Sequence, residues 1–225
     1  MTPASSTEWS GFWLNARNFR WSAVDQVILE RVASLLGGGP ARTLVELGAG
    51  RGEHSRRLCD MALCARPDVF DPCPEAYEYM RSVGLAAIRD ENDLKPGYDI
   101  VWSNGLIEHF FEGERQAIVT RHFRLSRDWV LIVVPRRNWQ RKVWKPRQGV
   151  PRQVEYTERE LCDRLLEGAR EAWGRDPAGL GVDSFCPLFG VRHIPDRLYP
   201  LVDRLTGWAL PGGLLIGWAR RGTGD

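Results

Sequence analysis

Short runs rich in β-forming residues alternate with helical stretches along most of this 225-residue chain. Strands that alternate with helices form a parallel sheet, because each helix carries the chain back to the start of the next strand. The β-rich runs cover residues 43–47, 69–71, 86–88, 99–103 and 129–134. The helical stretches cover residues 54–62, 74–82, 114–124 and 158–167, and residues 171–175 and 214–220 are predicted as two final strands.

The region before the first strand has a different pattern. Apolar residues recur at helical spacing over residues 22–36, with Ser22 and Asp25 placed as a capping pair, and a glycine run with Pro40 ends the helix. We therefore expect an N-terminal helical cap over residues 1–39 and a main domain over residues 40–225. An insertion at about 176–212 is expected to cover the substrate.

Composition and spacing exclude several other classes of protein. The net charge of +2 is too small to mark the whole chain as a nucleic-acid binder. No apolar run is long enough to cross a bilayer, and the first residues do not form a secretory signal, so we expect a cytoplasmic protein. Five cysteines lack the spacings of zinc or iron-sulfur sites, so we expect them to be reduced and to bind no metal.

A glycine-rich loop follows the first predicted strand. Glu46 precedes Gly48, Gly50 and Gly52, and a helix begins directly after them. Glycine lets a backbone turn tightly and approach a ligand closely, although tight turns also use glycine for structural reasons. Ligands bind at the carboxyl ends of the strands in an open parallel sheet, and this loop lies there.

Carboxylates follow the next two predicted strands. Asp71 comes about twenty residues after the glycine loop, where a carboxylate can accept hydrogen bonds from both hydroxyls of a ribose. Asp90 and Glu91 follow the third strand, where side chain and backbone could contact an adenine edge. Each aspartate alone is also consistent with a turn or a helix cap. Their joint placement at successive strand ends favours a nucleoside-containing ligand.

The order of these motifs resembles that of class I S-adenosylmethionine-dependent methyltransferases. The resemblance covers residues 45–52, 69–71, 90–94 and 98–109, all between residues 43 and 135. It implies an α/β, Rossmann-like, seven-stranded and mostly parallel sheet, with an antiparallel last strand and flanking helices. It also implies S-adenosyl-L-methionine as the cofactor, with Glu46 and the glycine loop at its methionine part and Ser103 and Asn104 facing the methyl group. The implied cofactor-binding residues are Glu46, Gly48, Ala49, Gly50, Gly52, Asp71, Pro72, Asp90, Glu91, Ser103 and Asn104.

The acceptor side of the site is less strongly defined by the sequence. His109 follows the fourth strand and is the candidate base for a hydroxyl acceptor, although it could also serve only in packing. Trp13 and Trp21 in the cap, and Arg137 and Trp139 in the basic stretch 136–147, are candidate substrate contacts. These features favour a small acceptor that is aromatic or lipid-like, and the basic stretch could also contact a carrier or a membrane surface.

Three alternatives remain open. A nicotinamide dehydrogenase also uses a glycine loop followed by an acid, but its fingerprint needs glycine where this chain has Glu53. A non-catalytic or regulatory cofactor-binding protein could have the same fold. A methyltransferase acting on RNA or protein is the third alternative, although we expect no nucleic-acid partner. The sequence predicts no oligomeric state.

Overall fold

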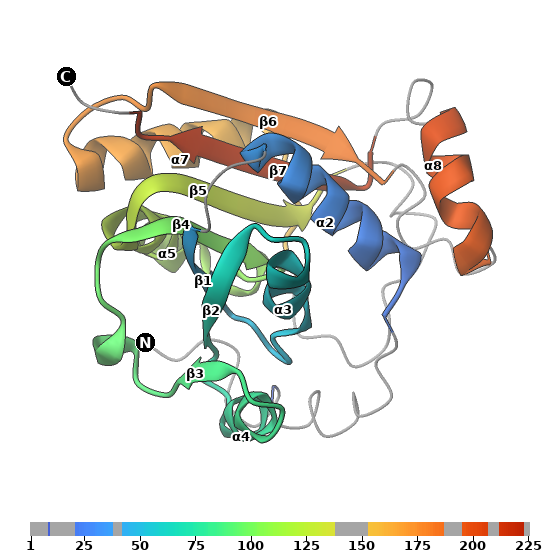
Figure 1. Cartoon of the computed structure of the whole chain (residues 1–225). Helices are drawn as coiled ribbons and strands as arrows, with labels where there is room; N and C mark the ends of the chain where they lie inside the picture. The colour runs from blue at the N-terminus through green and yellow to red at the C-terminus, as the bar shows by residue number, and fades with distance from the viewer. Residues whose placement is uncertain are drawn as a thin grey trace.

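The computed structural model describes residue 9 and residues 21–37, 42–137, 153–186, 195–206 and 212–222. Within these residues the chain forms one sheet of seven strands in the order β3-β2-β1-β4-β5-β7-β6 (Figure 1). The pairs among the first five strands are parallel, whereas β7 runs antiparallel to both β5 and β6. The predicted α/β fold with an antiparallel last strand is confirmed. The strands are β1 (Arg42–Leu47), β2 (Cys64–Phe70), β3 (Ala86–Ile88), β4 (Tyr98–Asn104), β5 (Ser126–Pro135), β6 (Gly179–Phe185) and β7 (Leu214–Arg220).

Helices cover both faces of this sheet. On one face, α2 and α3 pack Leu29, Val32 and Leu58 against β1, β4 and β5. On the other face, α5 and α7 pack Phe123 and Leu165 against β5 and β7. The helices are α2 (Ala23–Leu36), α3 (Glu53–Asp60), α4 (Pro74–Ser82), α5 (Glu112–Leu125), α7 (Glu158–Trp173) and α8 (Tyr199–Thr206), with short 3₁₀ turns η2 (Glu91–Asp93), η3 (Ile107–His109) and η4 (Asp196–Leu198).

The start of α2 forms as the sequence predicts. Ser22 is the N-cap, and its hydroxyl accepts a hydrogen bond from the Asp25 amide at 3.3 Å. The Asp25 carboxylate in turn accepts one from the Ser22 amide at 2.9 Å. This capping box satisfies two amide donors at the helix start and fixes the orientation of the Asp25 side chain.

The strand predicted at residues 171–175 is wrong. Helix α7 continues through this stretch, because Leu165, Ala169 and Trp173 keep the helical spacing of its buried side. The helix ends only at Gly174, whose φ of +69° suits glycine. The sixth strand is β6, which lies inside the stretch predicted as an insertion, so the connection between β6 and β7 begins after Phe185.

Two glycines make β6 hard to recognise in the sequence, since glycine is disfavoured in strands. The indole of Trp218, on the neighbouring strand, explains them. A Cβ added to Gly181 would come within 2.6 Å of that indole, and one added to Gly179 within 3.1 Å. The edge strand β6 therefore has glycine at both positions, and this lets the Trp218 indole pack against its backbone.

The expectation that all five cysteines are reduced is also wrong. Cys59, near the end of α3, forms a disulfide with Cys64, the first residue of β2. The two residues are separated by five positions, and the turn between helix and strand brings their Cα atoms to 4.7 Å, within the range that a disulfide needs. Cys73, Cys162 and Cys186 are free thiols.

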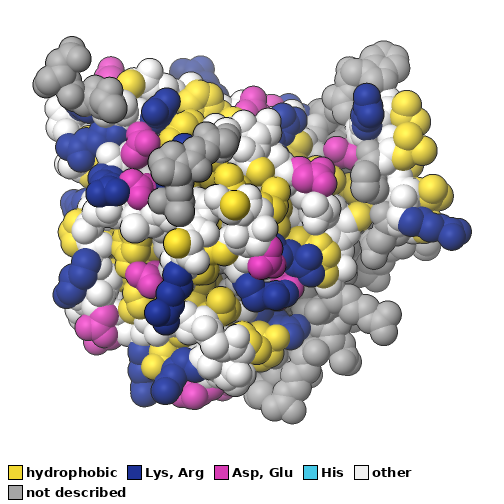
Figure 2. Space-filling view, in the orientation of Figure 1, with side chains coloured by type: hydrophobic (Ala, Val, Ile, Leu, Met, Phe, Trp, Pro, Cys, Tyr) yellow, Lys and Arg dark blue, Asp and Glu magenta, His cyan; other side chains and the backbone are white. Residues whose placement is uncertain are grey.

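The described surface carries mixed charges. Figure 2 shows basic and acidic side chains interspersed over the visible face, with no broad area of one sign. This agrees with the net charge of +2. None of the helices in the described ranges is both long and apolar enough to span a bilayer.

Candidate functional site

The candidate site lies at the carboxyl ends of β1, β2 and β4. From β1 the chain crosses to β2 on one side, and from β4 it crosses to β5 on the other, so the strand order reverses between β1 and β4. Crossover loops diverge at such a point and leave a crevice in which open α/β sheets bind ligands. The groups described below surround this crevice.

The glycine loop has the backbone shape that requires glycine. Gly48, Gly50 and Gly52 have φ values of +68°, +55° and +66°. A Cβ at Gly48 would also lie 2.6 Å from the Leu106 side chain, and one at Gly52 would lie 2.5 Å from Leu85. The loop is fixed to the end of β2, because the Ala49 amide donates to the Phe70 carbonyl at 2.9 Å. The loop is therefore rigid and lies close to the second strand.

Asp71 connects this loop to the start of α4. Its Oδ2 accepts a hydrogen bond from the Gly50 amide at 2.8 Å, and its Oδ1 accepts one from the Cys73 amide at 2.9 Å. Burial raises the pKa of this carboxyl to about 6, although the two backbone donors act to lower it. Each carboxylate oxygen keeps a second lone pair for a ligand hydroxyl. The neighbouring Pro72 is exposed.

Glu46 lies almost fully buried at the end of β1. Its Oε2 accepts hydrogen bonds from the Ser55 hydroxyl at 2.6 Å and from the Ser55 amide at 3.2 Å. The Ser55 hydroxyl also accepts one from the Trp102 indole at 3.2 Å. Burial raises the pKa of Glu46 to about 7, against the opposing effects of His54 and Ser55. This carboxyl therefore titrates near neutral pH.

The His54 side chain contacts residues of α2 and β4 beside the same crevice. Its Nε2 lies 3.0 Å from Asp25 Oδ1 and 3.3 Å from Asn104 Nδ2. Burial acts to lower the pKa of His54, but the hydrogen bond with Asp25 and the charges of nearby carboxylates outweigh burial and raise it. Burial also acts to raise the pKa of Asp25, but His54 and Ser22 bring it below its usual value. The contact between His54 and Asp25 thus fixes α2 beside the glycine loop.

Trp21, a predicted substrate contact, lies next to this pair. Its ring centroid is 5.2 Å from that of His54, and the Arg57 guanidinium lies 4.0 Å from the centre of the indole. The sequence interpretation missed His54, Ser55, Asp25 and Trp102. His54 and Ser55 could have been noticed because they begin the helix after the glycine loop, whereas nothing local to Asp25 indicates that it pairs 29 residues away.

Ser103 and Asn104 point to opposite faces of the sheet. The Ser103 hydroxyl is buried against α5, 2.9 Å from His122 Nε2, while His122 Nδ1 lies 2.8 Å from the Ile118 carbonyl oxygen. Burial lowers the pKa of His122 to about 4, so this imidazole is neutral at physiological pH. The Ser103 hydroxyl is therefore engaged away from the crevice, and only Asn104 directs a side chain toward it.

His109 lies in η3, directly beyond β4. It is 7% exposed, and its Nε2 lies 3.9 Å from Glu108 Oε1. The ring of Trp9 meets the His109 ring edge-on, with 4.8 Å between their centroids. The chain that returns after β5 also reaches this turn, since the Val154 amide donates to the Glu108 carbonyl at 3.0 Å. One residue of the predicted N-terminal cap thus covers the candidate base.

The other predicted residues lie farther from the glycine loop or outside the described ranges. Asp90 Oδ1 caps η2 by accepting two hydrogen bonds from Asn92, each of 2.9 Å, and Glu91 pairs with Arg121 at 3.3 Å. Arg137 pairs with Glu160 at 3.1 Å and donates to the Glu155 carbonyl. Trp13, Trp139 and most of the stretch 136–147 lie outside the described residues.

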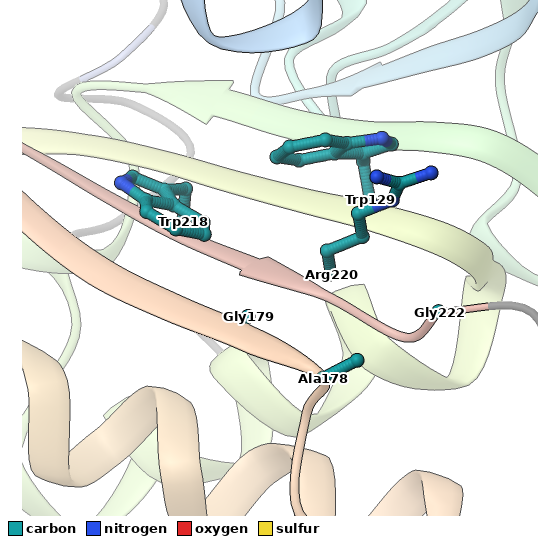
Figure 3. A pocket seen from close by; sticks show the side chains of 6 residues that line it. All are labelled: Trp129, Ala178, Gly179, Trp218, Arg220 and Gly222. Carbon is teal, nitrogen blue, oxygen red and sulfur yellow. The ribbon is translucent and has the colours of Figure 1, made fainter.

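A shallow hollow lies at the opposite edge of the sheet. Trp129, Trp218 and Arg220 line it together with Ala178, Gly179 and Gly222 (Figure 3). Its volume of about 390 Å³ would suit a small molecule. However, Trp129 and Arg220 are paired residues at the amino-end side of β5, away from the glycine loop. We therefore do not include this hollow in the candidate site.

Comparison with known proteins supports the fold. No family model and no curated protein matches the sequence. Among solved structures, an S-adenosylmethionine-dependent methyltransferase from Archaeoglobus fulgidus aligns with a TM-score of 0.64 and 11% identity, over 93% of this chain and 99% of that one. The 1,6-didemethyltoxoflavin-N1-methyltransferase of Burkholderia thailandensis has bound 1,6-didemethyltoxoflavin and S-adenosylhomocysteine. It aligns with a TM-score of 0.60 and 16% identity, over 96% of this chain and 88% of that one.

A third similar structure is the magnesium protoporphyrin IX methyltransferase of Synechocystis PCC 6803 with bound S-adenosylhomocysteine. It aligns with a TM-score of 0.60 and 14% identity, over 89% of this chain and 84% of that one. The chain therefore has the fold of class I S-adenosylmethionine-dependent methyltransferases. At such identities the likeness concerns the fold, and function must be argued from the site.

Proposed function

We propose that this chain is an S-adenosylmethionine-dependent methyltransferase that acts on a small acceptor, aromatic or lipid-like. The observation that carries the proposal is the hydrogen bond from the Gly50 amide to the Asp71 carboxylate. It lies at the edge of the sheet where the strand order reverses. It places a carboxylate suited to a ribose directly against a glycine loop suited to close ligand approach. Glu53 occupies the position where a dinucleotide fingerprint needs glycine, and its carboxylate pairs with Arg56 and Arg57.

The carboxyl groups of the crevice fit this cofactor. S-adenosylmethionine carries a sulfonium and an ammonium group, and both favour a negatively charged site. Glu46 and Asp71 are buried carboxyls whose pKa values are raised to about 7 and about 6. A buried carboxylate without a counter-charge is unfavourable, so a bound cation would stabilise the ionised form of both groups. We assign the methionine part to Glu46 and the glycine loop, and the ribose to Asp71.

Asp90 and Glu91 remain our candidates for the adenine part, and Asn104 our candidate for the side that faces the methyl group. The cofactor, when bound, supplies a methyl group already activated by its sulfonium. The chain must then orient the acceptor and, where the acceptor is a hydroxyl, remove a proton. His109 is the candidate base, since it lies beyond β4 with Glu108 beside it and Trp9 over its ring.

Aromatic side chains support a ring-containing or apolar acceptor. Trp9 and Trp21 both lie beside histidines at the carboxyl edge of the sheet. Aromatic rings in a concave site favour flat or apolar ligands. Two of the similar structures belong to enzymes named for ring compounds, a toxoflavin precursor and a magnesium porphyrin. Trp13 and Trp139 remain predicted contacts of the same kind.

Calorimetry with three ligands tests the cofactor assignment. We expect S-adenosylmethionine and S-adenosylhomocysteine to bind and a nicotinamide dinucleotide not to bind. Asp71→Ala should weaken binding by about 1.5 to 3 kcal/mol, the amount expected for lost hydrogen bonds to a charged group. Asp68→Ala, within β2 and three residues before Asp71, is the matched control and should leave the affinity unchanged. Unchanged affinity in Asp71→Ala would remove the ribose assignment.

Turnover tests the acceptor class. Purified protein with labelled S-adenosylmethionine would be offered pools of phenols, quinols, tRNA and an unfolded protein mixture. Methylation of the small ring compounds is the expected result. Steeply salt-dependent binding and methylation of tRNA would show that the small-molecule assignment is wrong, and cofactor binding without any methyl transfer would favour a regulatory protein.

A further inference from the structure

Helix α8 belongs to the connection between β6 and β7. Because β6 and β5 both run antiparallel to β7, this connection leaves the sheet at the carboxyl edge, the same edge as the glycine loop. The inner side of α8 faces α2, and Tyr199 is buried in the core cluster that α2 shares with the sheet. Figure 1 shows α8 at the side of the molecule, beyond α2, with its other side turned outward.

The outer side of α8 is apolar. Leu198, Leu201 and Leu205 are 43%, 55% and 60% exposed. Leu201 and Leu205 are four residues apart and lie on one face of α8, and Leu198, the last residue of η4, directly precedes this helix. The other large apolar residues that are exposed in the described ranges are Met61, Val83 and Phe111, which lie singly on separate elements. Scattered apolar side chains are normal on a surface, but three exposed leucines within eight consecutive residues of η4 and α8 are not scattered.

The charged side chains described on η4 and α8 differ in their burial. Asp203 is partly buried and lies near Arg31 of α2, which acts to lower its pKa, although burial has the larger effect and raises it. Arg197 and Arg204 are exposed and form no ion pair with any residue that the structure describes. Figure 2 shows apolar side chains along the outer side of α8, with basic side chains near both ends of the row. The outward surface is thus apolar with a positively charged border.

We propose that this face of α8 docks on a bilayer that contains anionic phospholipids. Leucines can enter the boundary between headgroups and acyl chains while arginines contact the anionic headgroups, and such binding is weak and reversible. The inference rests on the proposed function in one respect, because docking would bring the acceptor side of the crevice to the surface where a lipid-like acceptor dissolves. The row is short, so α8 lies on the membrane and does not cross it.

A second copy of the chain fits the same face less well. In a symmetric contact the same patch meets itself, so the exposed arginines of both copies would come close together. A stable interface also needs about 800 Å² from each partner. An eight-residue helix is about 12 Å long, and its two exposed leucines together with Leu198 of η4 supply only a fraction of this area. A bilayer needs no such area and favours the same arginines.

Vesicle flotation tests the proposal. The intact protein would be mixed with vesicles of phosphatidylcholine alone, or with three parts in ten replaced by phosphatidylglycerol. We expect wild-type protein to float with the anionic vesicles at low salt and at least fivefold less with the neutral ones. The variant that carries Leu201→Ser and Leu205→Ser should lose at least nine-tenths of this binding. Val83→Ser, at a residue 46% exposed elsewhere on the surface, is the matched control and should float as wild type does.

A second variant pair and two further measurements make the outcome decisive. Arg197→Gln with Arg204→Gln should remove the preference for anionic vesicles. Circular dichroism shows that each variant is folded, and light scattering reports its mass. The proposal is wrong if wild-type protein does not float, if the leucine variant floats equally well, or if the leucines instead hold a dimer together.

Calorimetry with S-adenosylhomocysteine, without vesicles, separates this inference from the proposed function. Wild-type protein and the leucine variant should bind it with equal affinity. Cofactor binding without flotation would overturn the docking inference alone. Flotation that depends on the leucines, in a protein that binds no S-adenosylhomocysteine, would support docking and overturn the proposed function.

Discussion

The two faces of β4 bury polar side chains in different ways. On the α5 face, Ser103 meets His122, whose imidazole is held neutral by burial with a pKa of about 4. On the α3 face, the crevice contains Glu46 with a pKa of about 7 and His54 with a raised pKa. On the α5 face the polar groups are hydrogen-bonded to one another, and the imidazole carries no charge at physiological pH. The α3 face keeps groups whose charge depends on what binds beside them, and this is the behaviour expected of a functional site.

The largest effect is expected from a substitution in the glycine loop. Gly50→Val places a branched side chain at a φ of +55° and in the path of a ligand, so we expect no detectable binding of S-adenosylhomocysteine by calorimetry. Gly37→Val is the matched control, since Gly37 has a φ of +64° and nothing lies within 4 Å of an added Cβ. Both variants should lose about 1–3 kcal/mol of stability through backbone strain. Loss of binding in both, or in neither, would contradict a role specific to the loop.

The next largest difference is expected between His109 in η3 and His122 in α5. If the acceptor is a hydroxyl, His109→Ala should lower turnover on the order of 10² to 10⁴-fold while cofactor affinity stays unchanged. His122→Ala should instead leave the Ser103 hydroxyl without its partner and lower the free energy of unfolding by about 1–3 kcal/mol. Initial rates across pH and thermal unfolding distinguish the two. Near-normal turnover in His109→Ala at every pH would leave that residue a packing role.

The buried carboxyls predict opposite pH dependences for stability and for binding. Because burial raises the pKa of Glu46 from 4.5 to about 7, the folded protein holds this proton more tightly than the unfolded chain. Its contribution to stability is present at low pH and is lost as pH rises toward 7. The affinity for a cationic cofactor should change in the opposite direction and fall as pH drops from 8 to 5.5, as Glu46 and Asp71 take up protons.

Glu46→Gln isolates this effect. Without cofactor, the variant should be more stable than wild type at pH 8 by up to about 3 kcal/mol, since it buries no charge. Its cofactor affinity should be low and should depend less on pH. Glu53→Gln, at a carboxylate paired with Arg56 at the surface of α3, is the control and should leave affinity unchanged. Wild-type stability that rises between pH 5 and 8 because of Glu46 would mean that the carboxyl is ionised throughout.

The smallest effect is expected at Arg137, away from both faces of β4. Its side chain is 51% exposed and its guanidinium pairs with Glu160, and exposed pairs of this kind contribute about 0–1 kcal/mol. Arg137→Gln should therefore change the KM for the acceptor by less than about fivefold. The measurement is KM as a function of ionic strength, once an acceptor is known. A large, salt-dependent rise in KM would instead establish the predicted substrate contact.

The sequence predicted the parts of this structure that depend on local pattern. The glycine loop, the capping box of α2 and the strands that end near Leu47, Phe70 and Asn104 follow from residue type and spacing over short distances. The opposite directions of Ser103 and Asn104 could also have been predicted, because successive side chains in a strand alternate between faces. Assigning both to the crevice overlooked this rule.

The features that were missed depend on contacts between distant segments. Nothing near Gly181 in the sequence shows that Trp218 will lie over it and make glycine favourable in a strand. The pairing of Asp25 with His54 exists only once α2 has packed beside α3. The disulfide between Cys59 and Cys64 depends on where a helix ends and a strand begins, and such boundaries are the least predictable part of a sequence interpretation.

The disulfide and the Glu46–Ser55 contact act on the same helix from its two ends. Helix α3 has eight residues, too few to be stable in isolation. Glu46 accepts two hydrogen bonds from Ser55 near its start, and the Cys59–Cys64 bond ties its end to β2. Because both ends are attached to the sheet, we expect α3 to fray and rotate less than a free helix, and we expect the loop before it to be ordered before a ligand binds. Binding then requires little loss of backbone conformational entropy, and most of the favourable contact energy is retained as affinity.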